Sequence, residues 1–330
     1  MRAARLHGVG DLRVATEPAP DDLPDRSRVR VSAVGLCGSD LHWFSEGAIG
    51  DAVLDRPMVL GHELAGVVLT GPLAGATVGI DPAIPCGRCP TCGRGDEHLC
   101  QRMDFAGHGG VDGGLQEELI WPTRLLYRLP DGYDGAQGAL LEPLGVAVHS
   151  LDLSHLRAGA EAGVVGCGPI GLLLIQLAVA SGARVTAVEP LPHRRDAAVR
   201  AGAAEAVDPA GVPDARSLDG CDVVFEVSGA DDGLARAGAL VRPGGRIVLV
   251  GIPDGDRTSF QASQLRRKGV TLACVRRMTA SAYARGIRLA GSGVVDLSWL
   301  TTHRFGLDRA AQAFEVATSR EGLKVVVDVS

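Results

Sequence analysis

The amino-acid sequence predicts an α/β protein of two domains, in which a doubly wound parallel sheet is joined to a second, β-rich domain. The chain has 330 residues, about the length of two ordinary domains. After Glu142, short apolar runs alternate with helical segments rich in Ala and Leu, whereas the runs before about Leu129 are separated by Gly and Pro. The composition, 46% apolar with a formal net charge of -6, allows a large core and excludes the strong positive field of a nucleic-acid-binding protein.

The first domain is predicted to combine both ends of the chain. Alternating residues from Arg28 to Val34 predict a half-buried strand. The segment from Thr301 to Ser330 returns to a helix and an alternating strand, so we expect it to rejoin this domain. We therefore assign residues 1–146 and 279–330 to the first domain and residues 147–278 to the parallel-sheet domain.

The parallel sheet is predicted from five apolar runs, which are Gly163 to Val165, Val185 to Val188, Val223 to Val227, Ile247 to Val250 and Val270 to Val275. These runs lack alternating polarity because helices would cover both faces of the sheet. The last run would be an apolar edge strand, which proteins seldom leave bare in water. We therefore expect a homodimer or homotetramer.

The sequence also limits the location of the protein and the kind of partner it has. The N-terminus lacks an apolar segment of signal-peptide length, and the most apolar stretch, Pro169 to Ala183, is too short to span a bilayer. Of the eight cysteines, four crowd between Cys86 and Cys100, which suits a metal better than paired disulfides. We expect a cytoplasmic protein that acts on a small molecule, with no membrane or nucleic-acid partner.

A glycine loop predicts a Rossmann dinucleotide site. The sequence GVVGCGPIG forms a G-x-G-x-x-G pattern directly after a strand and at the head of a helix. The first glycine permits the tight turn, the second lets the backbone approach a pyrophosphate, and the helix N-terminus offers unpaired N–H groups. A chance glycine loop is the alternative. We assign to the cofactor site Gly166, Gly168, Pro169, Ile170, Gly171, Ser228, Val250 and Gly251.

The choice between NAD and NADP depends on the end of the second strand of this domain. Glu189 ends that strand, near the spacing at which an acidic residue binds the ribose hydroxyls and repels a 2′-phosphate. Arg194 and Arg195 could instead hold such a phosphate, or they could lie on a solvated helix face. We predict NAD as the cofactor rather than NADP, with Arg194 close to it.

Four cysteines predict a structural zinc site. Cys86, Cys89, Cys92 and Cys100 form a C-x2-C-x2-C-x7-C pattern in a loop rich in Gly and Pro. Four thiolates make a closed tetrahedral site, which stabilises a loop and leaves no position for chemistry. A pair of disulfides and an iron–sulfur cluster are the alternatives.

A second metal site is suggested by residues outside that loop. Cys37 lies in CGSDLH, His62 and Glu63 lie in GHE, and Glu142 lies in LLEPLG. Thiolate, imidazole and carboxylate groups are zinc ligands in catalytic sites. Taken alone, such scattered residues fit an ordinary core equally well.

The order of the motifs resembles that of the zinc-containing medium-chain dehydrogenases, particularly polyol-oxidising members such as the sorbitol dehydrogenases. CGSDLHWF, PMVLGHELAG, the four-cysteine loop, LLEPLGVAVHS and GVVGCGPIG follow one another along essentially the whole chain. The resemblance implies a GroES-like catalytic domain, a Rossmann domain, and two zinc ions per chain, one catalytic and one structural. It also implies that Cys37, His62 and Glu63 bind the catalytic zinc, with Glu142 at the metal directly or through water.

The resemblance assigns further roles near the catalytic zinc. Asp40 corresponds to the carboxylate that orients the zinc-bound imidazole, although it could be a surface turn residue. Ser39 and His42 match a relay that passes the proton of the alcohol through a hydroxyl and the nicotinamide ribose to an imidazole. Ser39 could also simply form a turn, and His42 could be an exposed loop residue.

The substrate implied is a secondary alcohol, namely a polyol, sugar alcohol or (amino)cyclitol, which is oxidised to the ketone. The resemblance places Trp43, Phe105 and Arg277 at the substrate, and His108, on the same loop as Phe105, is expected to add a polar contact. The segment VRRM from Val275 to Met278 departs from the family pattern, and Trp43 could equally be core. A threonine or simple secondary-alcohol dehydrogenase is the second hypothesis, and a non-catalytic binding relative is the third.

Overall fold

The computed structural model describes residues 1–211, 220–253 and 257–330 of the chain. The chain divides into two compact units. The first unit consists of Met1–Gly145, Thr279–Gly291 and Asp296–Ser330, and the second of Val146–Met278 and Ser292–Val295. The sequence-based boundary at residue 146 lies one residue after the first junction of the structure, and the second boundary falls at residue 278 in both. The sequence-based division assigned Ser292–Val295 to the first domain, whereas the structure groups these residues with the second unit.

The first unit is built on a mixed sheet with the strand order β12-β8-β7-β3-β20-β19, in which β11 also pairs with β3. The bounds of these strands are β3 (Arg26–Gly35), β7 (Glu63–Val68), β8 (Thr77–Ile80), β11 (Glu118–Pro122), β12 (Leu126–Arg128), β19 (Thr301–Gly306) and β20 (Lys324–Asp328). β20 pairs antiparallel with β3, with Val327 opposite Val34. The C-terminal segment therefore joins the sheet that the N-terminal segment begins.

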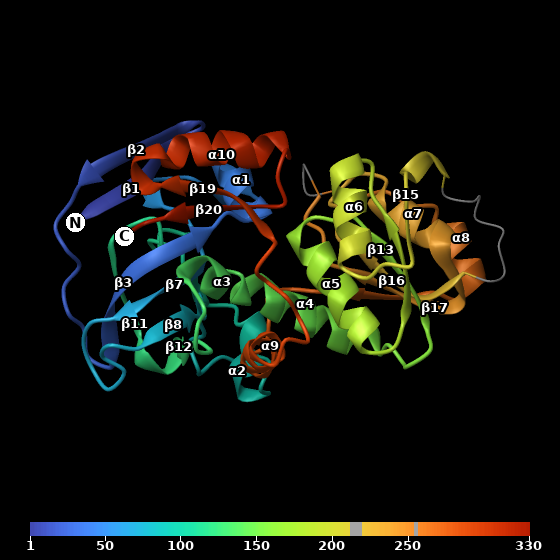
Figure 1. Ribbon diagram of the computed structural model, residues 1–330, viewed down its shortest axis with the longest axis horizontal. Coiled ribbons are helices and arrows are strands. Elements are labelled where there is room, and N and C mark those ends of the chain that lie inside the picture. Colours follow the sequence, from blue (N-terminus) through green and yellow to red (C-terminus); the bar gives the residue numbers. More distant parts are fainter. Residues whose placement is uncertain (212–219, 254–256) are drawn as a thin grey trace. The chain divides into compact units, whose positions relative to one another are not determined.

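Shorter elements complete the first unit. The remaining strands are β1 (Arg2–Gly8), β2 (Asp11–Thr16), β4 (Ala48–Ile49), β5 (Ala52–Val53), β6 (Met58–Val59), β9 (Ala83–Ile84) and β10 (Asp104–Phe105). The helices are α1 (Gly38–Glu46), α2 (Pro90–Gly93), α3 (Gly135–Ala139), α9 (Ala280–Gly291) and α10 (Ala310–Ser319), with 3-10 turns η1 (Glu97–Leu99), η2 (Thr123–Leu125) and η5 (Leu307–Arg309). α10 packs on β19 and β20 (Figure 1).

The core of the first unit is formed by apolar side chains from these strands and from α10. Leu6, Leu64, Trp121 and Phe314 are among its fully buried members. The indole N–H of Trp121 donates to the carbonyl oxygen of Asp81 over 2.8 Å, so this large ring is buried without an unpaired donor. The core thereby packs beneath the segments that carry the predicted metal ligands.

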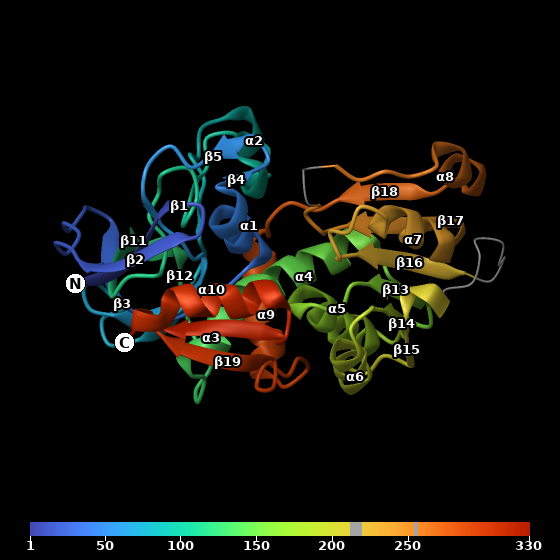
Figure 2. The same ribbon diagram turned by 90° about the horizontal axis from the view of Figure 1, so that it is seen from above.

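The second unit is a six-stranded parallel sheet with the order β15-β14-β13-β16-β17-β18. Its strands are β13 (Glu161–Val165), β14 (Arg184–Val188), β15 (Glu205–Val207), β16 (Cys221–Glu226), β17 (Val241–Leu249) and β18 (Thr271–Cys274). Its helices are α5 (Pro169–Ala180), α6 (Pro192–Arg200), α7 (Gly233–Leu240) and α8 (Ala262–Lys268), and it has one described 3-10 turn, η3 (Pro209–Gly211). The helix α4 (Leu141–Ser154) begins in the first unit and continues into the second. β18 lies at one edge of the sheet (Figure 2).

The sequence analysis missed one strand of this sheet and shortened another. β15 has only three residues and no apolar run, so it gave no signal. β17 begins at Val241, ahead of the expected run that starts at Ile247. Its start was not predicted because the first residues of the strand include Pro243 and two glycines, which are unusual in strands. Within the residues that the structure describes, we find no helix with the length and apolar character needed to cross a bilayer.

Candidate active site

Three predicted metal ligands come together in the first unit. The sulfur of Cys37, a ring nitrogen of His62 and a carboxylate oxygen of Glu63 all lie within 4.8 Å of one another. His62 and Glu63 are buried, and Cys37 is half-buried. One thiolate, one imidazole and one carboxylate fit a zinc ion that keeps a fourth position open for water or substrate.

The antiparallel pairing of two strands explains why these ligands meet. Gly35 at the end of β3 lies opposite Glu63 at the start of β7. The chain leaves β3 and reaches Cys37 two residues later, so the thiol lies beside the loop that carries His62. A side chain at Gly35 would collide with the Glu63 carboxylate. Glycine is therefore required here by the space that the metal ligand occupies.

Asp40 connects the two segments that carry the ligands. Its carboxylate accepts hydrogen bonds from the backbone N–H of Cys37 (3.0 Å) and of Gly61 (3.1 Å). It also lies 3.4 Å from Nδ1 of His62. Burial opposes ionisation of Asp40, but the attraction and hydrogen bond of His62 and the backbone N–H groups of Cys37 and Gly61 together lower the pKa of this carboxyl group. Asp40 is thus a buried carboxylate, not a surface turn residue, and it orients the His62 ring.

Lys324, which is buried beside the same cluster, was not predicted from the sequence as a site residue. Its ammonium group forms an ion pair with Glu63 and donates a hydrogen bond of 2.9 Å to the carbonyl oxygen of Leu36. Burial disfavours the charged amine, but the attraction of Glu63 and Cys37 raises the pKa of Lys324 above its usual value. The signal in the sequence is one lysine at the head of the apolar strand KVVVD.

Glu142 begins α4 and interacts electrostatically with the same groups. Burial raises its pKa to about 8, with His62 and Lys324 acting against this and Glu63 adding to it. Glu142 is not one of the three residues in the close ligand group. Its position therefore suits a carboxyl group that lies near the predicted metal site, is largely neutral when no metal is bound, and is not one of the three close ligands.

The residues expected at the substrate have different surroundings. The ring of Phe105 lies 5.3 Å from that of His62, measured between centroids. The ring of Trp43 lies 5.4 Å from that of His108 and is buried in the core of the first unit. Arg277 belongs to the second unit and has a left-handed backbone with φ of 58°. The ring of Phe105 is therefore in contact with a predicted metal ligand.

The four-cysteine loop brings its sulfur atoms together as a second group. The sulfur atoms of Cys86, Cys89, Cys92 and Cys100 lie within 4.8 Å of one another, and the Cys89–Cys100 distance is 3.8 Å. A tetrahedral zinc with Zn–S bonds of 2.3 Å gives an S–S separation of about 3.8 Å. All four are free thiols, which excludes the disulfide alternative. The donor set fits a closed structural zinc.

The protonation of these thiols is uneven. The backbone N–H of Cys92 lowers the pKa of Cys89 to about 5, whereas burial raises the pKa of Cys92 to about 12. Close thiolates repel one another in the absence of a cation. A bound metal ion would remove this repulsion by accepting all four sulfurs as thiolates.

In the second unit, the glycine loop has the geometry that a dinucleotide requires. Gly166 has φ of 97°, and a side chain at Gly171 would collide with the carbonyl oxygen of Gly166. Gly168 caps α5, and Pro169 and Ile170 occupy its first turn. The loop is thus a tight turn that leads directly into a helix N-terminus.

Glu189 holds this loop. One carboxylate oxygen accepts the backbone N–H of Cys167 over 2.8 Å, and the other accepts that of Leu191 over 3.0 Å. Arg195 donates to the carbonyl oxygens of Glu189 and Pro190 and pairs with Asp208. The guanidinium of Arg194 lies 3.9 Å from the position that a Cβ on Gly168 would take. Arg194, rather than Arg195, is therefore the arginine beside the glycine loop.

Glu226, at the end of β16, anchors the loops that carry Ser228, Val250 and Gly251. It was not predicted from the sequence. Its carboxylate accepts the hydroxyl (2.5 Å) and the backbone N–H (2.9 Å) of Ser228. Its carbonyl oxygen accepts the N–H groups of Val250 and Gly251. A side chain at Gly166 would also meet Ser228. Ser228, Val250 and Gly251 thus share one anchor, and Ser228 lies against the glycine loop.

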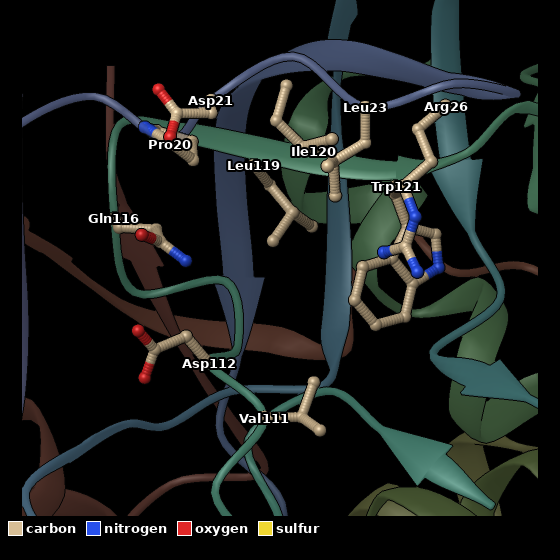
Figure 3. A pocket seen from close by; sticks show the side chains of 10 residues that line it. All are labelled: Pro20, Asp21, Leu23, Arg26, Val111, Asp112, Gln116, Leu119, Ile120 and Trp121. Carbon is tan, nitrogen blue, oxygen red and sulfur yellow. The ribbon is translucent and has the colours of Figure 1, made fainter.

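A separate cavity of about 380 Å³ lies in the first unit, between the segment before β3 and strand β11 (Figure 3). Its walls include Leu23, Arg26, Asp112 and Trp121. Asp112 is already paired with Arg5. None of the lining residues is a predicted site residue, so we assign this cavity no part in the reaction.

Comparison with known proteins agrees with this geometry. Residues 23–131 match the alcohol dehydrogenase GroES-like domain, and residues 169–292 match the zinc-binding dehydrogenase domain. Sorbitol dehydrogenase of Bacillus subtilis is 32% identical over 99% of this chain and 97% of its own length. The chain belongs to the zinc-binding alcohol dehydrogenase family. The predicted resemblance, the fold class of a Rossmann sheet plus a GroES-like domain, and an oxidoreductase acting on CH–OH groups are all confirmed.

Solved structures of other members of this dehydrogenase family share the fold over their whole length. The L-idonate 5-dehydrogenase of Escherichia coli superposes with a TM-score of 0.93 at 28% identity, covering 99% of this chain and 98% of that one. A zinc-binding dehydrogenase of Sinorhizobium meliloti bound to NADP has a TM-score of 0.90 at 29% identity, covering 99% of each chain. A nicotinamide cofactor is thus typical of dehydrogenases with this fold, whereas these structures leave the choice between NAD and NADP open.

Proposed function

We propose that this dehydrogenase oxidises a secondary alcohol of a polyol, sugar alcohol or (amino)cyclitol to the ketone, with NAD as the hydride acceptor. The observation that carries the proposal is the approach of Cys37, His62 and Glu63 within 4.8 Å. Bound there, zinc supplies a Lewis acid that lowers the pKa of an alcohol and so favours the alkoxide. The polyol class follows from relatives such as sorbitol dehydrogenase.

The side chains around the cluster have separate tasks in this proposal. Asp40 holds the ring of His62 so that Nε2 faces the metal position. The hydroxyl of Ser39 lies 3.5 Å from that Nε2, close enough to accept the proton of an alcohol bound at the cluster. His42, on the same helix, receives the proton. Glu142 offers a buried carboxyl group beside the metal site, and Phe105, Trp43, His108 and Arg277 contact the substrate.

NAD is proposed over NADP because of the position of Glu189. Both of its oxygens are held by backbone N–H groups, which fixes a carboxylate at the end of β14. A 2′-phosphate there would be repelled by this charge. The hydrogen bonds that Arg195 makes to carbonyl oxygens and to Asp208 turn it away from such a phosphate. Arg194 would then lie against the cofactor without selecting NADP.

Two zinc ions per chain are proposed, one at the Cys37 cluster and one in the four-cysteine loop. We further infer a cytoplasmic enzyme, because eight free cysteines suit a reducing compartment. A homodimer or homotetramer is proposed because the edge strand β18 leaves Leu272 exposed. Metal analysis and light scattering of the purified protein test the first and last of these points.

The test of function is NADH formation at 340 nm with the zinc-loaded protein. Polyols, cyclitols, aminocyclitols, threonine and simple secondary alcohols are each offered with NAD and with NADP. We expect chelator-sensitive turnover of one polyol or cyclitol with NAD, and its loss in the Cys37→Ser variant, which leaves the four-cysteine loop untouched. Turnover of threonine or a simple secondary alcohol alone would overturn the substrate class, and a preference for NADP would overturn the role of Glu189.

A further inference from the structure

A row of protic side chains runs along one face of α1. Ser39, His42 and Glu46 are separated by three and four residues, so a helix places them on the same side. Ser39 lies 3.5 Å from Nε2 of His62 at the metal cluster. The side chain of His42 is 14% exposed and that of Glu46 is 46% exposed. The row therefore leads from the buried site to the surface.

Glu46 is in direct contact with His42. Its carboxylate oxygen Oε1 lies 2.8 Å from Nδ1 of the imidazole. A carboxylate has no proton to donate at neutral pH, so this contact requires the imidazole to carry its proton on Nδ1. Nε2 then becomes the basic nitrogen of His42.

The location of Glu46 is unfavourable for the helix itself. It is the last residue of α1, where the helix dipole disfavours negative charge, and no basic residue occupies the last turn. The acidic residue also follows its partner by four positions, which is the weaker order for a pair on a helix. Helix stability therefore gives no reason for a carboxylate here, whereas its contact with His42 does.

We propose that Glu46 is a positioning residue for proton release, which fixes the tautomer and ring orientation of His42. Ser39 accepts the alcohol proton at the buried end of the relay and Nε2 of His42 receives a proton at its outer end, where the Glu46 carboxylate offsets the positive charge of the resulting imidazolium. The imidazolium then returns the proton to water, and the hydride leaves separately to the dinucleotide. This inference rests on the proposed dehydrogenase function and deepens it.

The first test does not depend on the substrate. Nitrogen-15 spectra of His42 in the zinc-loaded enzyme report which ring nitrogen carries the proton when the imidazole is neutral. We expect the Nδ1–H form in the parent enzyme and a mixture, or the Nε2–H form, in Glu46→Ala. The same spectrum for both proteins, or an Nε2–H form in the parent, would overturn the proposal.

The second test is kinetic. Loss of a partner that orients a metal-bound imidazole costs about 10- to 100-fold; taking the lower end for His42, which is not a metal ligand, we expect kcat of Glu46→Ala to fall about ten-fold with little change in KM. Ser45→Ala, in the same turn but on another face of α1, is the matched control and should keep parent kcat. An unchanged kcat in Glu46→Ala beside a lowered kcat in His42→Ala would overturn the role of Glu46 and leave the proposed function intact. An unchanged kcat in His42→Ala would overturn the relay itself.

Discussion

Replacement of Lys324 by methionine tests how the metal cluster is stabilised when no metal is bound. Lys324 and Glu63 each have side chains only 2% exposed. Methionine fills similar space but leaves the Glu63 carboxylate and the carbonyl oxygen of Leu36 without the ammonium group. Removing one partner of a buried ion pair costs about 3–5 kcal/mol, because the other charge stays buried and uncompensated.

The expected loss differs between the metal-free and the zinc-loaded protein. For a unit of this size, each kcal/mol corresponds to about 2–4 °C, so the melting midpoint of the metal-free first unit should fall by roughly 6–20 °C. Zinc bound beside Glu63 replaces the lost positive charge, so the midpoint of the zinc-loaded Lys324→Met protein should fall by much less. Zinc should therefore stabilise the variant more than it stabilises the parent.

Differential scanning calorimetry of both forms measures these midpoints. Arg13→Met is the matched control, because Arg13 and Asp11 form an ion pair that is 63% and 41% exposed, and its midpoint should hardly move. An equal fall in the metal-free and zinc-loaded forms of Lys324→Met would refute the reasoning. So would a metal-free variant that is as stable as the parent.

Three further substitutions give separate tests. Cys92→Ser should reduce the zinc content by about one ion per chain, measured by elemental analysis, and an unchanged zinc content would contradict a four-cysteine site. Gly171→Ala should weaken NADH binding at least ten-fold, measured by fluorescence, because its methyl group meets the Gly166 carbonyl; parent affinity would count against this loop as the cofactor site. Burial raises the pKa of Asp81 from the ordinary 3.8 to about 6, so the fold loses stability as the pH rises through that range and keeps the full loss above it. Asp81→Asn keeps the hydrogen bond from the Ala83 N–H and should raise the free energy of unfolding by about 3 kcal/mol at pH 8 and by about half of that at pH 5. Thermal unfolding measures both values. An equal gain at the two pH values would rule out titration of Asp81.

Sequence patterns predicted those parts of the fold and site that depend on local order. The apolar runs that begin at Gly163, Val185 and Val223 form strands of the parallel sheet. They could be predicted because a strand buried on both faces has apolar residues at nearly every position. The GHE motif and Cys37 were assigned to a zinc site through the resemblance to a known family, because their residue types alone fit an ordinary core equally well.

The missed residues depend on contacts that no local pattern encodes. Lys324 meets Glu63 only because β20 returns to β3, far away along the chain. Glu46 looks like any solvated helix residue until its contact with His42 is known. Trp43 was left open between a substrate position and the core, because its burial depends on how the first unit packs around α1.

The pairing of β20 with β3 also has a consequence for how the enzyme is made. The ammonium group of Lys324 and the Leu36 carbonyl it contacts are 288 residues apart in the chain. At 5–20 residues per second, a ribosome needs roughly 15–60 s to extend the nascent chain from one to the other. During that interval the parallel sheet can fold, while Glu63 lacks its buried counter-charge. Uptake of the catalytic metal in its final surroundings is therefore among the last events of synthesis, and the four-cysteine loop, whose ligands all lie within fifteen residues, can bind metal long before it.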